Sequence, residues 1–143
     1  MTDHPKTVLF LCTGNSCRSI MAEAILNEDG KPGFQAFSAG STPTRQVHPE
    51  ALACIARNGM TLEAPSSQSW DDYMDQPIDI VVTVCDNAAA EVCPVMPGQN
   101  IKIHWSIPDP ASLTGTQEEI EAGFQAVFDD LHGRIEGLVA EYS

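Results

Sequence analysis

Residues 7–27 read TVLFLCTGNSCRSIMAEAILN, and three different local structures follow one another within them. Residues 7–11 are apolar and begin with β-branched side chains, which predicts a short buried strand. Residues 12–18 contain a glycine and small polar side chains, which is typical of a turn. Residues 19–27 place apolar side chains at helical spacing, and Ser19 is a suitable N-cap for that helix. The stretch therefore predicts a strand, a tight turn and a helix in immediate succession.

The same alternation of strands and helices continues along the chain. Residues 78–84 (IDIVVTV) give the strongest strand signal, and their near-continuous β-branching indicates burial on both faces. Thr116 and Glu119 form a capping box, after which apolar residues recur every three or four positions up to residue 142, as in a long helix. The other predicted elements are strands at 34–38 and 101–105, a helix at 48–58 and a short amphipathic piece at 70–74.

This order of elements predicts an α/β fold. We expect a three-layer single domain over residues 1–143, with a four-stranded parallel sheet and helices on both faces. Ligands of such sheets bind beyond the carboxyl ends of the strands. Cys12 and Cys85 directly follow the two clearest strands, so both are expected at the same edge of the sheet.

Charge and composition exclude several classes of function. Seven basic and 20 acidic residues give a net charge of −13, which argues against nucleic acid and anionic membranes as partners. The longest apolar run near the N-terminus, residues 8–11, is too short for a membrane span or a secretory signal. We therefore expect a cytoplasmic protein, in which the five cysteines are catalytic, metal-binding or buried rather than a disulfide framework.

Cys12 and Arg18 enclose five residues between the predicted strand and the N-terminus of the helix. Backbone N–H groups and the helix dipole make such a turn an anion-binding site, and Gly14 lets the turn curl tightly. The guanidinium of Arg18 can grip a tetrahedral oxyanion through two hydrogen bonds. The same positive field favours the nucleophilic thiolate form of Cys12. The pattern predicts a cysteine nucleophile beside an oxyanion cradle.

Three segments resemble a known family. CTGNSCRSIMAEA at 12–24 resembles the signature loop of the low-molecular-weight tyrosine phosphatases, and more closely that of the arsenate reductases that share their fold. VVTVCDNAAAEVCPVMPG at 81–98 resembles the redox segment of those reductases, and HWSIPDPA at 104–111 resembles their general-acid loop. The segments occur in the family's order, and the likeness extends over essentially the whole chain. The resemblance implies a phosphatase-like fold and arsenate reductase activity.

The resemblance also implies a role for each site residue. Cys12 would be the nucleophile, Asp109 the proton donor, and Cys85 and Cys93 the two further members of a disulfide relay. The final disulfide would be reduced by thioredoxin, with glutaredoxin and glutathione as the alternative. A monomer without cofactor or metal is expected. Arsenate, with phosphate and sulfate as mimics, would contact Thr13, Gly14, Asn15, Ser16, Cys17, Arg18 and Ser19.

The spacing of the two relay cysteines leaves their local structure open. A continuous helix from Cys85 to Cys93 would hold the α-carbons ~12 Å apart at 1.5 Å per residue. A disulfide needs α-carbons about 4.4–6.8 Å apart. Residues 86–92 are therefore either looped back already or must unwind before the two sulfur atoms meet.

Other functions share parts of this pattern. A phosphatase acting on phosphotyrosine or another phosphomonoester needs the same loop, but that family usually places a tyrosine after its general acid, where this chain has Ala111. A non-enzymatic oxyanion-binding redox sensor is a third possibility. Some family members hold potassium near the loop. Asn15, Glu23 and Ser38 match three ligand positions, whereas residues 65–70 supply no clear carboxylate, so the sequence leaves potassium open.

Overall fold

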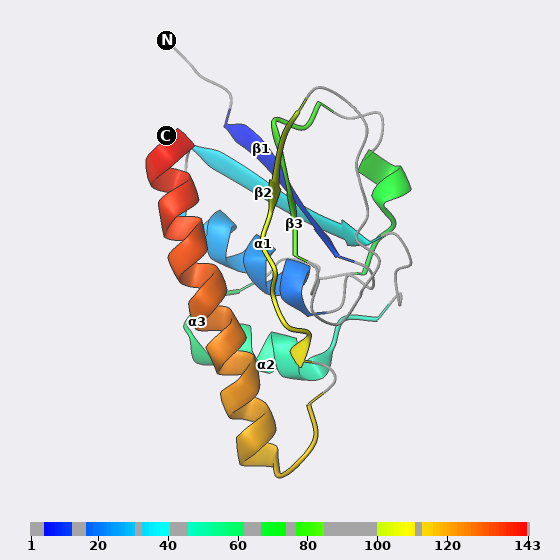
Figure 1. The fold of residues 1–143 in the computed structure, drawn as a ribbon, viewed down its shortest axis with the longest axis vertical. Helices are drawn as coiled ribbons and strands as arrows, with labels where there is room; N and C mark the ends of the chain where they lie inside the picture. Colours follow the sequence, from blue (N-terminus) through cyan, green and yellow to red (C-terminus); the bar gives the residue numbers. More distant parts are fainter. Residues whose placement is uncertain are drawn as a thin grey trace.

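The computed structural model describes residues 5–12, 17–30, 33–40, 46–61, 67–73, 77–84, 100–110 and 113–142. These residues form four strands, three α-helices and one 3-10 helix (Figure 1). The strands are β1 (Lys6–Cys12), β2 (Phe34–Gly40), β3 (Ile80–Thr83) and β4 (Ile101–His104). The helices are α1 (Arg18–Asp29), α2 (Pro49–Arg57), α3 (Gln117–Tyr142) and the 3-10 helix η1 (Trp70–Tyr73).

The four strands form one parallel sheet in the order β2-β1-β3-β4. The chain moves from β1 to β2 on one side and then to β3 and β4 on the other, so the strand order reverses between β1 and β3. In sheets of this kind, the crevice at such a reversal, at the carboxyl ends of the strands, is where ligands bind. The predicted fold class is confirmed, and its binding edge is the one where β1 ends at Cys12.

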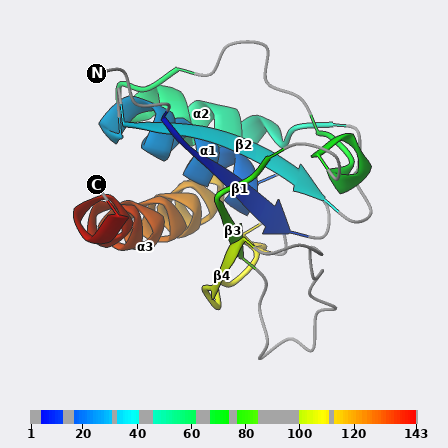
Figure 2. The same cartoon turned by 90° about the horizontal axis from the view of Figure 1, so that it is seen from above.

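Both faces of the central strands are covered. Val8, Phe10 and Cys12 belong to the larger core cluster, which also contains the buried residues of α1, α2 and α3. Leu9 and Leu11 belong to a smaller cluster on the other face. That cluster includes residues of η1, which lies well away from the three α-helices (Figure 2). Burial on both faces explains why these strands are almost continuously apolar.

Helix ends follow the signals in the sequence at two of the three α-helices. Gly59, just after α2, has a φ of 76°, which suits a residue that ends a helix without a Cβ clash. At the start of α3, the backbone N–H of Glu119 donates to Thr116 Oγ1 at 3.2 Å, and the backbone N–H of Thr116 donates to Glu119 Oε1 at 3.1 Å. The predicted capping box is therefore confirmed.

The N-cap predicted for α1 is wrong. The helix begins at Arg18 with Cys17 as its N-cap residue, and the Cys17 side chain makes no capping hydrogen bond. Ser19 instead lies inside the first turn, where it is fully buried and its side chain forms a hydrogen bond with Cys12. The Ser19 side chain therefore contacts the last residue of β1 and does not cap α1.

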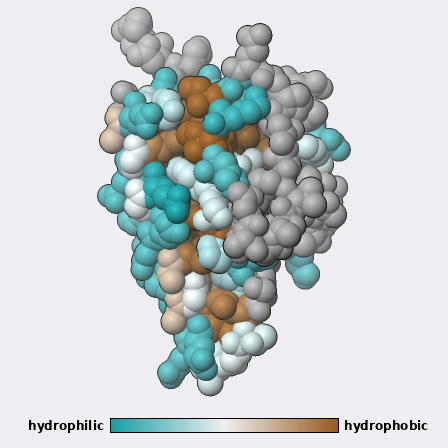
Figure 3. Space-filling model, viewed as in Figure 1, coloured by the Kyte–Doolittle hydropathy of each residue, from teal (hydrophilic) through white to brown (hydrophobic). Residues whose placement is uncertain are grey.

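The described surface shows few exposed apolar side chains. The large exposed ones are Leu52, Ile101 and Leu113. On the face drawn in Figure 3, hydrophobic areas are interrupted by broader hydrophilic ones. Within the described parts of the chain, no helix is both long and apolar enough to cross a membrane.

Candidate active site

The candidate site forms where β1 ends and α1 begins. Cys12 is the last residue of β1, and Arg18 is the first residue of α1. The neighbouring strand β3 ends at the same edge of the sheet, since the backbone N–H of Val84, the residue after β3, donates to the Leu11 carbonyl at 2.8 Å. The strand-to-helix transition therefore brings a thiol and a guanidinium to the carboxyl edge of the sheet, as the sequence predicts.

The Cys12 thiol is held by a buried serine. Cys12 Sγ lies 3.0 Å from Ser19 Oγ, and the two residues are 2% and 0% exposed. When the sulfur carries a negative charge, the serine hydroxyl must be the donor. A hydrogen bond to a charged group in a dry environment stabilises that charged form. The contact therefore places a hydroxyl group against the sulfur, which is the nucleophilic atom of cysteine.

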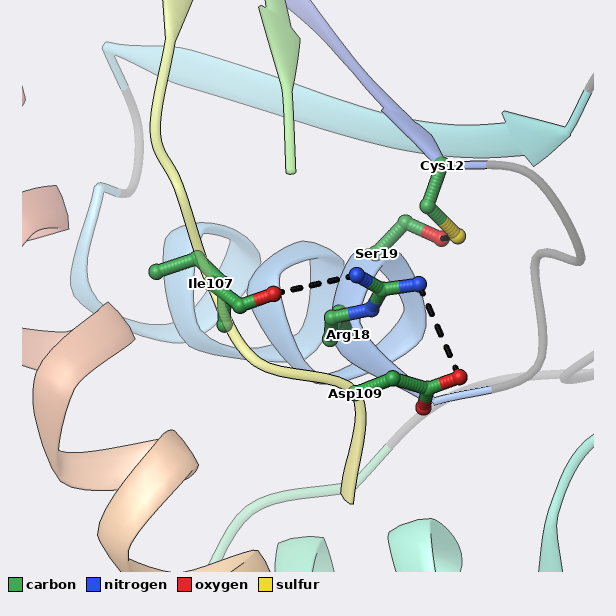
Figure 4. A network of polar contacts seen from close by, with 5 residues as sticks. All are labelled: Cys12, Arg18, Ser19, Ile107 and Asp109. Carbon is green, nitrogen blue, oxygen red and sulfur yellow. Dashed lines mark hydrogen bonds and ion pairs between the residues drawn. The ribbon is translucent and has the colours of Figure 1, made fainter. Parts of the chain in front are cut away.

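Arg18 connects the strand-to-helix turn to a distant loop. Its Nη1 donates to the carbonyl of Ile107 at 3.0 Å, and its Nη2 lies 3.8 Å from Asp109 Oδ2 (Figure 4). The arginine is 3% exposed, whereas the Asp109 side chain is 43% exposed. A guanidinium carries five N–H donors in a planar arrangement that suits an oxyanion.

Residues 105–110, which follow β4, hold Asp109 at the edge of the site. Ile107 is fully buried in the larger core cluster, and it fixes the middle of this loop. In Figure 4 the Asp109 carboxylate and the Cys12 sulfur lie on the same side of Arg18. A tetrahedral anion bound near the guanidinium would have the thiol and a carboxyl group as neighbours, which is an arrangement for attack and proton donation.

The structure brings together only part of the predicted site. Cys12, Arg18, Ser19 and Asp109 converge, and Cys17 is a buried N-cap residue beside them. The remaining predicted site residues lie outside the described residues, and they are Thr13, Gly14, Asn15, Ser16, Cys85 and Cys93.

One contact was not expected from the sequence. The carbonyl of Ile107 accepts a hydrogen bond from Arg18, and the two residues are 89 positions apart. A backbone carbonyl carries no residue-type signal. The one indication in the sequence was that Ile107, an apolar residue, stands between Ser106 and Pro108, which suggests that its side chain is buried in the core.

A second polar pair lies behind the turn. Ser38 Oγ, on β2, donates to Glu23 Oε1, on α1, at 2.6 Å. Burial raises the pKa of Glu23 from 4.5 to about 7, and the hydrogen bond from Ser38 opposes this effect. A carboxylate and a hydroxyl are oxygen ligands of the type that hard cations take, so this pair leaves the question of potassium open, as the sequence does. Within the residues described, no group of three or more His, Cys, Asp or Glu side chains is arranged to hold a metal.

Comparisons with known proteins agree with this geometry. Residues 7–143 match the family model described as low molecular weight phosphotyrosine protein phosphatase. An arsenate reductase of Halalkalibacterium halodurans is 38% identical over 130 residues, which cover 91% of this chain and 92% of the relative.

Solved structures show the same relationship. An arsenate reductase from Archaeoglobus fulgidus superposes with a TM-score of 0.79 at 28% identity, covering 93% of this chain and 98% of the other. A structure described as an arsenate reductase in the phosphate binding state also gives a TM-score of 0.79, at 29% identity, covering 96% and 99% of the two chains. The chain therefore belongs to the low molecular weight phosphotyrosine protein phosphatase family.

Proposed function

We propose that this protein reduces arsenate to arsenite with a relay of three cysteines, Cys12, Cys85 and Cys93. The observation that carries the proposal is the buried Cys12 thiol, hydrogen-bonded to Ser19 and placed beside Arg18 and Asp109. This arrangement suits attack on a tetrahedral oxyanion. The name of the relative that is 38% identical supports arsenate as that oxyanion.

The first step joins the nucleophile to arsenic. Arsenate binds to residues 13–19 and Arg18, and the Cys12 thiolate attacks the arsenic atom. An As–O bond breaks, and Asp109 donates a proton to the departing oxygen, which leaves as water. Arsenic is still in its +5 state, now bonded to the sulfur of Cys12.

The second step transfers the electrons. The Cys85 thiolate attacks the Cys12 sulfur, and the S–As bond breaks with its electron pair going to arsenic. Arsenite, with arsenic in the +3 state, leaves a disulfide between Cys12 and Cys85. Cys93 then attacks Cys85 and releases the Cys12 thiolate, which moves the disulfide to Cys85 and Cys93. Two thiols supply the two electrons, so the chemistry needs no organic cofactor.

An external dithiol must reduce the final disulfide. We assign thioredoxin to this step, since a disulfide formed inside one chain is the type of substrate that a dithiol reductant resolves by exchange. A relay of this type also requires a reducing compartment, which supports a cytoplasmic location. Glutathione with glutaredoxin remains the competing reductant, and the assay below separates the two.

The proposal is tested by arsenate-dependent NADPH consumption with thioredoxin and thioredoxin reductase. The variants Cys12→Ser, Cys85→Ser and Cys93→Ser are each expected to lose turnover. Cys54→Ser is the matched control, because Cys54 is buried on α2 and bonds to Gln125 on α3, outside the site. It is expected to turn over like the wild type.

Three other results would change the assignment. Turnover that survives Cys93→Ser removes the third member of the relay. Turnover that appears only with glutathione and glutaredoxin changes the reductant. If arsenate is never reduced, but wild type hydrolyses a phosphomonoester and Cys12→Ser does not, the protein is a phosphatase. The phosphatase outcome would use the same described contacts, since attack on phosphorus also needs Cys12, Arg18 and a proton donor.

A further inference from the structure

The loop that carries Asp109 is fixed at two points. One is the hydrogen bond from Arg18 to the Ile107 carbonyl, two residues before Asp109. The other is the end of β4, where the loop begins. Asp109 can donate a proton in the proposed reaction only if the loop places its carboxyl group within hydrogen-bond reach of the substrate oxygen. The contacts that hold the start of the loop therefore bear on catalysis.

Thr83 and His104 form that second attachment. The two residues are directly paired at the carboxyl ends of β3 and β4. Thr83 Oγ1 lies 2.9 Å from His104 Nδ1, and the backbone N–H of Trp105 donates to the Thr83 carbonyl at 2.8 Å. Thr83 Oγ1 also lies 3.4 Å from the Ile103 carbonyl, and the imidazole tautomer decides whether the hydroxyl donates to His104 Nδ1 or accepts from it.

The end of β4 needs such an attachment. This strand has four residues and lies at the edge of the sheet, with β3 as its neighbour. Three of its four residues are exposed, so little apolar packing holds it. On one face of the sheet Trp105 packs against Phe10, with ring centroids 6.2 Å apart. On the opposite face, His104 and Thr83 make the side-chain contact between the two strand ends.

We propose that His104, through its hydrogen bond to Thr83, is a positioning residue for Asp109. Without this bond, the end of β4 loses a side-chain attachment to β3 and keeps the backbone bond from Trp105 to Thr83. Asp109 lies five residues after His104 in the chain. Misplacing a reacting group by about 1 Å can slow an enzymatic reaction roughly a hundredfold. The inference rests on the proton-donor role given to Asp109 in the proposed function.

The test compares His104→Ala and Thr83→Val in two backgrounds, wild type and Asp109→Asn. The readout is the rate at which one equivalent of arsenate oxidises two thiols of the fully reduced protein, without an external reductant. In the wild-type background, each substitution is expected to slow this single turnover about tenfold. In the Asp109→Asn background, each is expected to change the rate less than about twofold, because the group that they position has already been removed.

Two conservative variants and one control separate positioning from stability. Thr83→Ser keeps the hydroxyl, and His104→Asn keeps a donor near the place of Nδ1, so both are expected to restore most of the rate. Lys102→Ala removes an exposed side chain from the same strand and the same face, two residues before His104, and should leave the rate unchanged. In the wild-type background, sulfate affinity should be the same in all these variants, because none of the contacts described for Arg18 and Cys12 involves Thr83, Lys102 or His104.

The outcomes distinguish this inference from the proposed function. If the wild-type protein loses no thiols when arsenate is added, both the proposed function and the positioning role of His104 are wrong. If Asp109→Asn reacts as fast as wild type, Asp109 is no proton donor and the positioning role falls with it, while the cysteine relay stands. If His104→Ala and Thr83→Val slow both backgrounds equally, or slow neither, the proposed function stands and His104 is no positioning residue. Thr83→Val keeps a β-branched side chain, so the test does not depend on the fold tolerating His104→Ala.

Discussion

The hydrogen bond between Ser19 and Cys12 allows a quantitative prediction. Ser19→Ala removes the hydroxyl that lies 3.0 Å from Cys12 Sγ and keeps the helix-compatible Cβ. Hydrogen bonds to charged groups contribute about 1.5–3 kcal/mol. Because every 1.36 kcal/mol in an activation barrier is a factor of ten in rate, losing this bond should slow the attack of the Cys12 sulfur on arsenate roughly 10- to 150-fold.

The assay follows thiol oxidation in the fully reduced protein after one equivalent of arsenate is added, without an external reductant. The rate of each variant is corrected by the same variant carrying Cys12→Ser, which measures thiol loss that does not depend on this nucleophile. Ser106→Ala is the matched control, since it removes an exposed hydroxyl from residues 105–110.

A rate for Ser19→Ala within about threefold of the wild-type rate would contradict the prediction, since a hydrogen bond to a charged group contributes more than that. A loss of rate with Ser106→Ala as large as that with Ser19→Ala would show that the effect is not specific to the buried contact.

Three further predictions follow from other contacts. Arg18→Lys keeps the charge but loses the planar pair of donors, and titration calorimetry should show sulfate binding weakened roughly 10- to 100-fold. Burial raises the pKa of Glu23 from 4.5 to about 7, so its charged form opposes folding by roughly 3 kcal/mol above pH 7 and by nothing below pH 4.5. In urea melts without alkali cations, Glu23→Gln should therefore gain stability relative to wild type as pH rises from 5 to 8. Thr116→Ala removes the capping box of α3 and should lower the free energy of unfolding by about 1 kcal/mol.

Each of these has an outcome that contradicts it. Unchanged sulfate affinity in Arg18→Lys would mean that charge alone, without the paired donors, holds the anion. A stability difference for Glu23→Gln that stays constant or falls with rising pH would mean that the carboxyl is not desolvated. Urea melts of Thr116→Ala that match wild type would mean that the start of α3 is held by its packing, with no contribution from the cap.

The sequence predicted the fold closely because local patterns and tertiary packing agree in it. The strand at 78–84, predicted to be buried on both faces, is observed as β3, one of the two central strands. The long apolar periodicity after Thr116 is observed as α3. Predicted bounds differ from observed ones by a few residues, since strand ends are decided by hydrogen bonds to neighbours rather than by residue type. The single-domain assignment over residues 1–143 stays a prediction.

The candidate site was predicted in part. Cys12 and Arg18 could be found because a strand, a short turn and a helix fix their relationship within a few residues. Ser19 was correctly placed in the site, but its N-cap role was wrong because its hydroxyl is used by the sulfur. The contacts of Arg18 with Ile107 and of Thr83 with His104 join residues far apart in the chain, and no local pattern encodes them. The relay formed by Cys85 and Cys93 stays a prediction, as both lie outside the described residues.

The contact between Arg18 and Ile107 also sets the order in which the site is completed during synthesis. The two residues are 89 positions apart, so at roughly 5–20 residues per second a ribosome needs roughly 5–20 s to make the chain between them. Throughout that time the nascent protein contains Cys12 and Arg18 but lacks the carbonyl and the carboxyl group that complete their surroundings. An unfinished chain therefore has the nucleophile without its proton donor, and the full site can assemble only after Ile107 and Asp109 have been made.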